Sequence, residues 1–133
     1  MNSFPQNNGT EFREAMMNRT RCFAQRVYRL CSSLPHTQEA SHMRDQLFRC
    51  ATSVAANYRA AHRAKSDRDY LNKLKICEEE ADESVFWIEM IVFCGLIAGE
   101  KTINLLQETN EITAIIATSC ITKRKHIEEN KNR

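Results

Sequence analysis

The sequence predicts an all-α protein that folds as an up-down-up-down antiparallel four-helix bundle. The 133 residues include only three glycines and two prolines, which is typical of a few long helices rather than many short strands. Four stretches carry apolar residues three or four positions apart, the spacing that places side chains on one face of a helix. Short connections join these stretches, so consecutive helices are expected to lie antiparallel and side by side.

The first predicted helix, residues 10–33, follows a polar segment, residues 1–9, that is expected to form a flexible arm. Arg19 or Thr20 interrupts its apolar face, which leaves open a bend or an exposed first half. The helix should end at Leu34, because a residue that precedes proline disfavours the α conformation. Its apolar face consists of Phe12, Met16, Phe23, Val27, Leu30 and Leu34.

The second predicted helix starts after Thr37 or Ser41, either of which can serve as its N-cap, and ends near Arg63. Its apolar side consists of Met43, Leu47, Cys50, Ala51, Val54, Tyr58 and Ala61. Ser66, followed three residues later by Asp69, resembles a capping box and predicts the start of a third helix.

The third predicted helix, residues 67–94, carries a coiled-coil-like seam whose members lie alternately four and three residues apart. The seam consists of Tyr70, Leu74, Cys77, Ala81, Ser84, Ile88 and Ile91. The fourth predicted helix, residues 100–125, presents a face made of Leu105, Thr109, Ile112, Ile116 and Ser119. The bundle is therefore expected to span residues 10–125, with a polar tail over residues 126–133.

A second apolar line follows the third helix on the side opposite the seam. It consists of Phe86, Met90, Phe93 and Ile97. A helix that is apolar on two sides cannot bury both of them inside one four-helix monomer. We therefore predict a subunit interface along this line. The alternative is that Trp87 and its neighbours only widen the core.

Basic residues gather in two regions of the predicted bundle. One is the connection between the second and third helices, residues 59–68, which we call the elbow. The other is the first helix, since residues 1–35 contain five arginines against two glutamates. Such cations can bind phosphates, although each also has the simpler role of a solvated cation near a helix end. The candidate nucleic-acid-binding residues are Arg59, Arg63, Lys65, Arg68, Arg19 and Arg26.

No motif for catalysis, metal binding or cofactor binding stands out, so the sequence predicts a protein that is not an enzyme and uses no cofactor. The acidic run at residues 78–83 invites a di-iron reading, but the E-x-x-H motif that such a site needs twice occurs once, at residues 39–42. We expect solvated or ion-paired acids instead, with Arg49 opposite Glu80 or Asp82. The six cysteines form no C-x-x-C pair and are expected to be reduced thiols that pack as small apolar groups.

The sequence carries no signal for secretion or for a membrane span. The first ten residues lack the apolar segment of a secretory signal. The longest apolar run, residues 91–98, is far shorter than the ~20 residues that a transmembrane helix needs. We therefore expect a cytoplasmic protein without a membrane partner.

Several segments resemble one family of bacterial four-helix-bundle proteins. These segments are NRTRCFAQRVYRLCSSLP (18–35), RCATSVAANYRAAHRAKS (49–66), EEEADESVFWIE (78–89) and GLI (95–97). They are similar to the 23S rRNA intervening-sequence proteins, also called the S23 family. The resemblance extends over about residues 11–120, which is nearly the whole predicted bundle.

The resemblance implies a homopentamer of up-and-down bundles, in agreement with the two apolar sides of the third helix. Some family members are encoded within insertions in 23S rRNA genes. A related group, the accessory proteins of diversity-generating retroelements, forms basic pentamers that bind reverse transcriptase and nucleic acid. Two hypotheses follow for this chain. It is a non-enzymatic homopentamer that associates with RNA or another nucleic acid, or it is a scaffold ring that binds a partner protein without nucleic acid.

Overall fold

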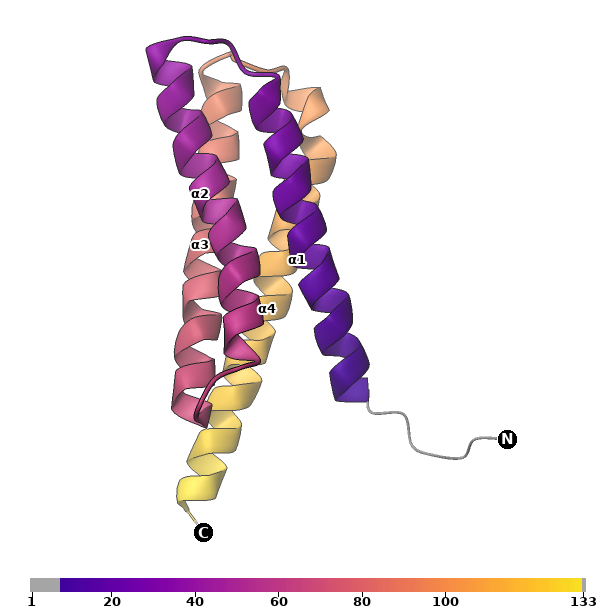
Figure 1. Ribbon diagram of the computed structural model, residues 1–133, viewed down its shortest axis with the longest axis vertical. Helices are drawn as coiled ribbons and strands as arrows, with labels where there is room; N and C mark the ends of the chain where they lie inside the picture. The colour runs from indigo at the N-terminus through magenta and orange to yellow at the C-terminus, as the bar shows by residue number, and fades with distance from the viewer. Residues whose placement is uncertain (1–7, 133) are drawn as a thin grey trace, which may run out of the picture.

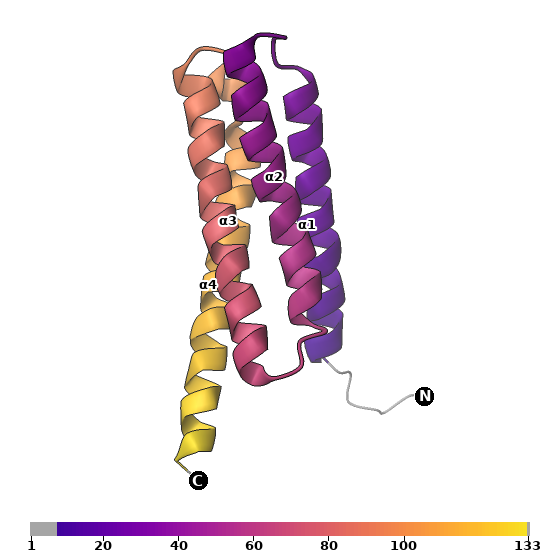
Figure 2. The same ribbon diagram turned by 60° about the vertical axis from the view of Figure 1, so that its left-hand side comes forward.

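The computed structural model describes residues 8–132, which form four α-helices and one short 3-10 helix. These are α1 (Asn8–Ser32), α2 (Gln38–Ala61), α3 (Asp67–Phe93), η1 (Gly99–Lys101) and α4 (Ile103–Lys131). Successive α-helices run in opposite directions, and the connections alternate between the two ends of the molecule (Figures 1 and 2). The predicted all-α bundle is therefore confirmed.

Local signals in the sequence set the starts of α2 and α3. The Thr37 hydroxyl accepts a hydrogen bond from the amide of Ala40, so Thr37 rather than Ser41 is the N-cap of α2. The Ser66 hydroxyl accepts a hydrogen bond from the amide of Asp69, as the capping-box pattern predicts. Each cap gives a partner to an amide that the first turn of a helix leaves free.

The α3 seam forms the centre of the core. Its residues from Leu74 to Ile91 are buried and pack against apolar residues of the other three α-helices. Cys31, Cys77 and Cys120 are buried free thiols in the same core, as predicted, while Cys50 is buried outside this cluster and Cys22 and Cys94 are exposed. The fully buried large side chains include Tyr58, Phe23, Leu47, Leu74, Ile88, Ile91, Ile112 and Ile116.

α1 continues through Thr20 without a break, although Thr20 interrupts the apolar face. It is fully buried, and its hydroxyl donates to the carbonyl oxygens of Met16 and Met17, 2.9 and 3.0 Å away. This local bond lets a polar residue lie in the core without a partner from another helix. The turns that precede Met16 are exposed, and Phe12 is 48% exposed.

The helices extend beyond the predicted bundle at both ends. Asn8 and Gly9, predicted as arm, begin α1, whereas residues 1–7 lie outside the described residues. The predicted polar tail is helical as far as Lys131, where α4 projects past the elbow (Figure 2). Charged residues without glycine or proline sustain a helix even where nothing packs against it.

The four α-helices do not pack against their neighbours to the same extent. α2 packs closely against α1 and α3, and α3 packs against α4, whereas α1 touches α4 much less. Figure 1 shows α1 and α4 diverging toward the elbow end of the molecule. This divergence leaves a space at the elbow end, and side chains from all four α-helices line it.

Candidate functional site

The structure separates the six predicted nucleic-acid-binding residues into three groups. Arg59, Arg63, Lys65 and Arg68 are all exposed at the elbow. Within residues 8–132, none of these four side chains forms an ion pair. Their charge is therefore available to an external anion.

Arg19 belongs to a different environment. Its Nη2 lies 2.6 Å from Glu108 Oε1 and 3.3 Å from Glu111 Oε1, and its Nε donates to Glu108 Oε2 at 2.9 Å. The hydrogen bond to Glu108 raises the pKa of Arg19, and the bond from Arg19 lowers the pKa of Glu108. Arg19 therefore joins α1 to α4, and unlike the elbow cations this candidate nucleic-acid-binding residue is already paired with two carboxylates.

Arg26 lies at the opposite end of the bundle from the elbow. With Arg29 and Lys101 it lines a cavity of about 620 Å³ whose apolar walls include Leu30 and Leu96. Among the described residues, no carboxylate lines this cavity. The contribution of Lys101 could not be found from the sequence, because Lys101 lies on a turn that only the bundle brings next to α1.

The second apolar line of α3 is only partly as predicted. Phe86 is 50% exposed and Phe93 is 88% exposed, while Met90 is half-buried. Ile97 does not continue the line, because α3 ends at Phe93 and Ile97 packs against the core. The exposed line therefore consists of Phe86, Met90 and Phe93.

Trp87 lies between the exposed line and α2. Its ring is 4.9 Å from the ring of Phe86 and 5.8 Å from the ring of His42, with edge-to-face geometry in both pairs. Trp87 also packs against the core cluster, so it does widen the core, as the alternative reading proposed. Phe86 and Phe93 nevertheless stay exposed, and core packing does not account for them.

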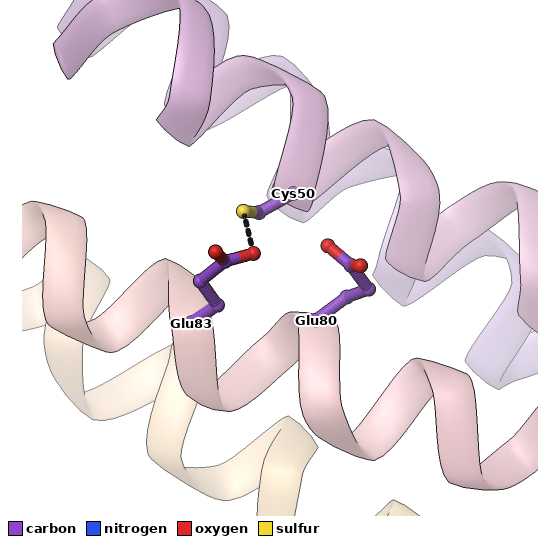
Figure 3. A group of neighbouring side chains, drawn as sticks. All are labelled: Cys50, Glu80 and Glu83. Atoms are coloured by element: carbon purple, nitrogen blue, oxygen red, sulfur yellow. Dashed lines mark hydrogen bonds between the residues drawn. The ribbon is translucent and has the colours of Figure 1, made fainter.

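Arg49, Cys50, Glu80 and Glu83 form a polar cluster that joins α2 to α3, and Figure 3 shows Cys50, Glu80 and Glu83. Arg49 bonds Glu80 at 3.2 Å and Glu83 at 2.7 Å, so the predicted pairing with Glu80 is confirmed, whereas Glu83 takes the place proposed for Asp82. Glu80 and Glu83 share one side of α3 at a spacing of three residues, and Asp82 points to solvent.

The same cluster brings one thiol and two carboxylates within reach of a single ion, since their ligand atoms lie within 4.8 Å of one another. The Cys50 thiol donates to Glu83 at 2.7 Å, and burial followed by this hydrogen bond raises the pKa of Cys50. The hydrogen bond from Cys50 lowers the pKa of Glu83, and Arg49 lowers it further. Because Arg49 already supplies the positive charge, the cluster is best described as an ion-paired link between helices.

Together these features define a four-helix bundle with exposed aromatic and basic surfaces. Among the described residues, no helix is long and apolar enough to cross a membrane. The chain belongs to the family described as 23S rRNA-intervening sequence protein, whose model matches residues 14–118. The resemblance inferred from the sequence is therefore confirmed.

A solved structure gives the same result. It is a protein of unknown function from the S23 ribosomal protein family of Bacteroides thetaiotaomicron, with 29% sequence identity and a TM-score of 0.75. The match covers 81% of this chain and 96% of the other. A search of curated proteins finds no match. These comparisons indicate no catalytic family for the chain.

Proposed function

We propose that this protein is a non-enzymatic homopentameric ring that associates with RNA through the elbow cations. The observation that carries the ring is the exposure of Phe86 and Phe93 on α3. Large exposed aromatic side chains on one face of a soluble helix are typical of a protein interface. The pentameric state is what the resemblance to the S23 family implies.

A ring requires two different surfaces on each subunit, because its interface is head-to-tail. The second surface we assign is formed by Tyr28 of α1 and Phe48 of α2, which are 59% and 40% exposed. Their ring centroids lie 6.2 Å apart, so they make one aromatic patch.

Phe86 lies near the height of the Tyr28 and Phe48 patch along the bundle. On α2, His42 is level with Trp87 and Arg49 is level with Glu83, so Phe86 is level with the segment that contains Phe48. In a ring whose rotation axis runs along the helices, residues at equal height on neighbouring subunits meet. Phe86 of one subunit would therefore contact Tyr28 and Phe48 of the next.

Two double variants test the ring. Phe86→Glu with Phe93→Glu removes the α3 patch, and Tyr28→Glu with Phe48→Glu removes the other patch. Each variant alone should be monomeric by light scattering. An equimolar mixture should form a heterodimer and nothing larger, because only one pair of complementary surfaces remains. Unchanged mass for either variant, or a monomeric wild type, would refute the assignment.

RNA association is supported by the four unpaired cations of the elbow and by the description of the family. Binding of a structured RNA should weaken steeply with salt, since phosphate contacts release counterions. Arg63→Glu with Arg68→Glu should weaken binding at least about tenfold. The matched control, Arg29→Glu with Lys101→Glu at the opposite end, should leave binding unchanged.

A scaffold ring that binds a protein partner is the second candidate. The observation in its favour is that Asp67 and Asp69 lie among the elbow cations and dilute their charge. A wild-type ring that shifts no structured RNA at ~50 mM salt would favour this candidate over RNA association. The ratio of absorbance at 260 and 280 nm, in material purified without a high-salt wash, shows independently whether nucleic acid co-purifies with the protein.

A further inference from the structure

A cavity of about 670 Å³ opens at the elbow end, where α1 and α4 diverge. Side chains from all four α-helices and from the elbow line it, and the volume lies within the usual range for small-molecule sites. The charged and polar residues of its lining include Arg13, His62, Lys65, Asp67, Thr122 and Lys123.

His62 is the least satisfied polar residue of this cavity. Both of its ring nitrogens are shielded from solvent, and neither has a hydrogen-bond partner in the described part of the chain. The ring is held edge-to-face between Tyr58, 4.6 Å away, and Tyr70, 5.3 Å away. A buried polar group without a partner is costly, so a movement of the ring that brings a nitrogen to the cavity lets a ligand bond to His62 with a gain in free energy.

The lining of the cavity carries a net positive charge. Lys123 bonds to Asp67 at 2.8 Å and lies over the ring of Tyr70, so this acid and this base neutralise each other. The side chains of Arg13 and Lys65 form no ion pair among residues 8–132, although the Asp69 carboxylate accepts a hydrogen bond from the amide of Lys65. Two cations are therefore left to attract an anion.

The α4 wall supplies neutral hydrogen-bonding groups. Thr118 and Ser119 donate to carbonyl oxygens of their own helix, at 3.0 and 3.1 Å, which leaves their oxygens free to accept. Thr122 also lines the cavity, and its hydroxyl can both donate and accept. The cavity thus offers cations at one side and uncharged polar groups at another.

We propose that the elbow cavity binds a small phosphate monoester, with the phosphate held by Arg13 and Lys65 and the polar organic part bonded to His62 and Thr122. Guanidinium and ammonium groups form strong charge-assisted bonds to phosphate oxygens. A mononucleotide has both required parts, a phosphate and a hydrogen-bonding ring. This site does not depend on the ring assembly or on RNA binding by the exposed elbow cations.

The test uses the full chain in phosphate-free buffer. Inorganic phosphate and uridine monophosphate are titrated while the imidazole nitrogens of His62 are followed by NMR. We expect saturable shifts with both probes, tighter binding of the nucleotide, and a dissociation constant of about 1 mM or lower. Sodium chloride at equal ionic strength should cause no saturable shift. Absence of saturation with both phosphates would refute the proposal.

Two double variants, each of which removes two positive charges, show where the nucleotide binds. Arg13→Gln with Lys65→Gln should weaken nucleotide binding at least about tenfold. Arg59→Gln with Arg63→Gln removes two exposed elbow cations that do not line the cavity and should leave binding within about twofold. An equal loss of nucleotide affinity in both variants would mean that the overall positive charge of the elbow attracts the nucleotide, and this would overturn the proposal. Far-UV circular dichroism checks that each variant is folded.

A short single-stranded RNA tests whether the bound phosphate belongs to a free nucleotide or to the 5′ end of an RNA. It is compared with a 5′-phosphate and with a 5′-hydroxyl, again by the shifts of His62. Stronger binding of the phosphorylated strand than of the free nucleotide would identify an RNA end as the ligand. Tighter binding of the free nucleotide would identify a small metabolite.

Discussion

Buried hydroxyl groups illustrate how single residues are accommodated in this core. Thr109 is fully buried, and its hydroxyl donates to the carbonyl oxygen of Leu105 at 2.7 Å. Ser84 donates in the same way to Glu80 at 2.8 Å. These bonds remain inside one helix, so they satisfy the hydroxyl without fixing how the helices pack.

This local satisfaction predicts different results for two neighbouring core residues. Thr109→Val keeps the volume and leaves no orphaned partner, so the free energy of unfolding should change by less than about 1 kcal/mol. Ile112→Ala removes buried methyl groups and should lower it by about 2–5 kcal/mol. Urea unfolding of both variants measures the difference. Similar losses for the two would contradict this account of the hydroxyl.

His62 gives a prediction for the dependence of stability on pH. Burial, followed by the charge of Arg13, lowers the pKa of His62 below its ordinary value of 6.5. The unfolded chain therefore binds a proton that the folded protein does not, as the pH falls from 6.5 toward the lower folded pKa. The free energy of unfolding should decrease over this interval.

The measurement is urea unfolding in phosphate-free buffer between about pH 7.5 and pH 5, above the range in which carboxyl groups titrate. His62→Phe should have a flatter profile than the wild-type protein, because its ring cannot take up a proton. Parallel profiles for the two proteins would show that His62 does not cause the decrease.

At the scale of elements, the end of α3 depends on a glycine. Gly95 has a φ of +76°, and its amide donates to Val92, while the amide of Leu96 donates to Ile91. These two bonds form a Schellman motif that terminates the helix. The turn directs the chain back toward α4 and places Leu96 against the core.

Gly95→Ala should lower the free energy of unfolding by about 1–2 kcal/mol, because a β-carbon strains the left-handed conformation. The space around Gly95 is open, so the strain is conformational and does not come from a clash. Gly95→Asn should lower the free energy of unfolding by less than Gly95→Ala does, since asparagine tolerates positive φ. Thermal or urea unfolding compares the variants. A greater loss for asparagine than for alanine would point to another cause.

The end of α4 shows what polarity can predict about an element. Residues 126–131 are mostly exposed, as a polar tail should be, yet they are helical. Polarity excludes burial, but it does not exclude helix, and lysine and glutamate are good helix formers. The predicted helix end at Lys125 was therefore placed too early.

At the scale of the whole molecule, the proposed ring predicts stability that depends on protein concentration. Association favours the folded state by mass action. The urea midpoint of the wild-type protein should rise with concentration, whereas that of Phe86→Glu with Phe93→Glu should not. Measurements over about a hundredfold range of concentration would test this, because the effect is logarithmic. A wild-type midpoint that stays constant would argue against the ring.

The sequence by itself determined the helices, their N-caps and the buried seams. Each of these features depends on residues three or four positions apart, which neighbour one another in any helix. The Leu74 to Ile91 seam and the cap at Ser66 were visible for this reason, whereas the structure decided that Thr37 rather than Ser41 caps α2. The clustering of cations at the elbow was also visible in the sequence, but Asp67 and Asp69 lie among them, so only the structure shows that the four side chains form no ion pair within residues 8–132.

Only the tertiary structure decided which polar groups meet across helices. Arg19 and Glu108 are separated by 89 positions, so their pairing depends on how α1 and α4 pack. Likewise, Arg13, His62 and Lys123 line one cavity because α1 and α4 diverge at the elbow end. Helical periodicity specifies the face on which a residue lies, but the residue that it meets is set by the packing of the whole bundle.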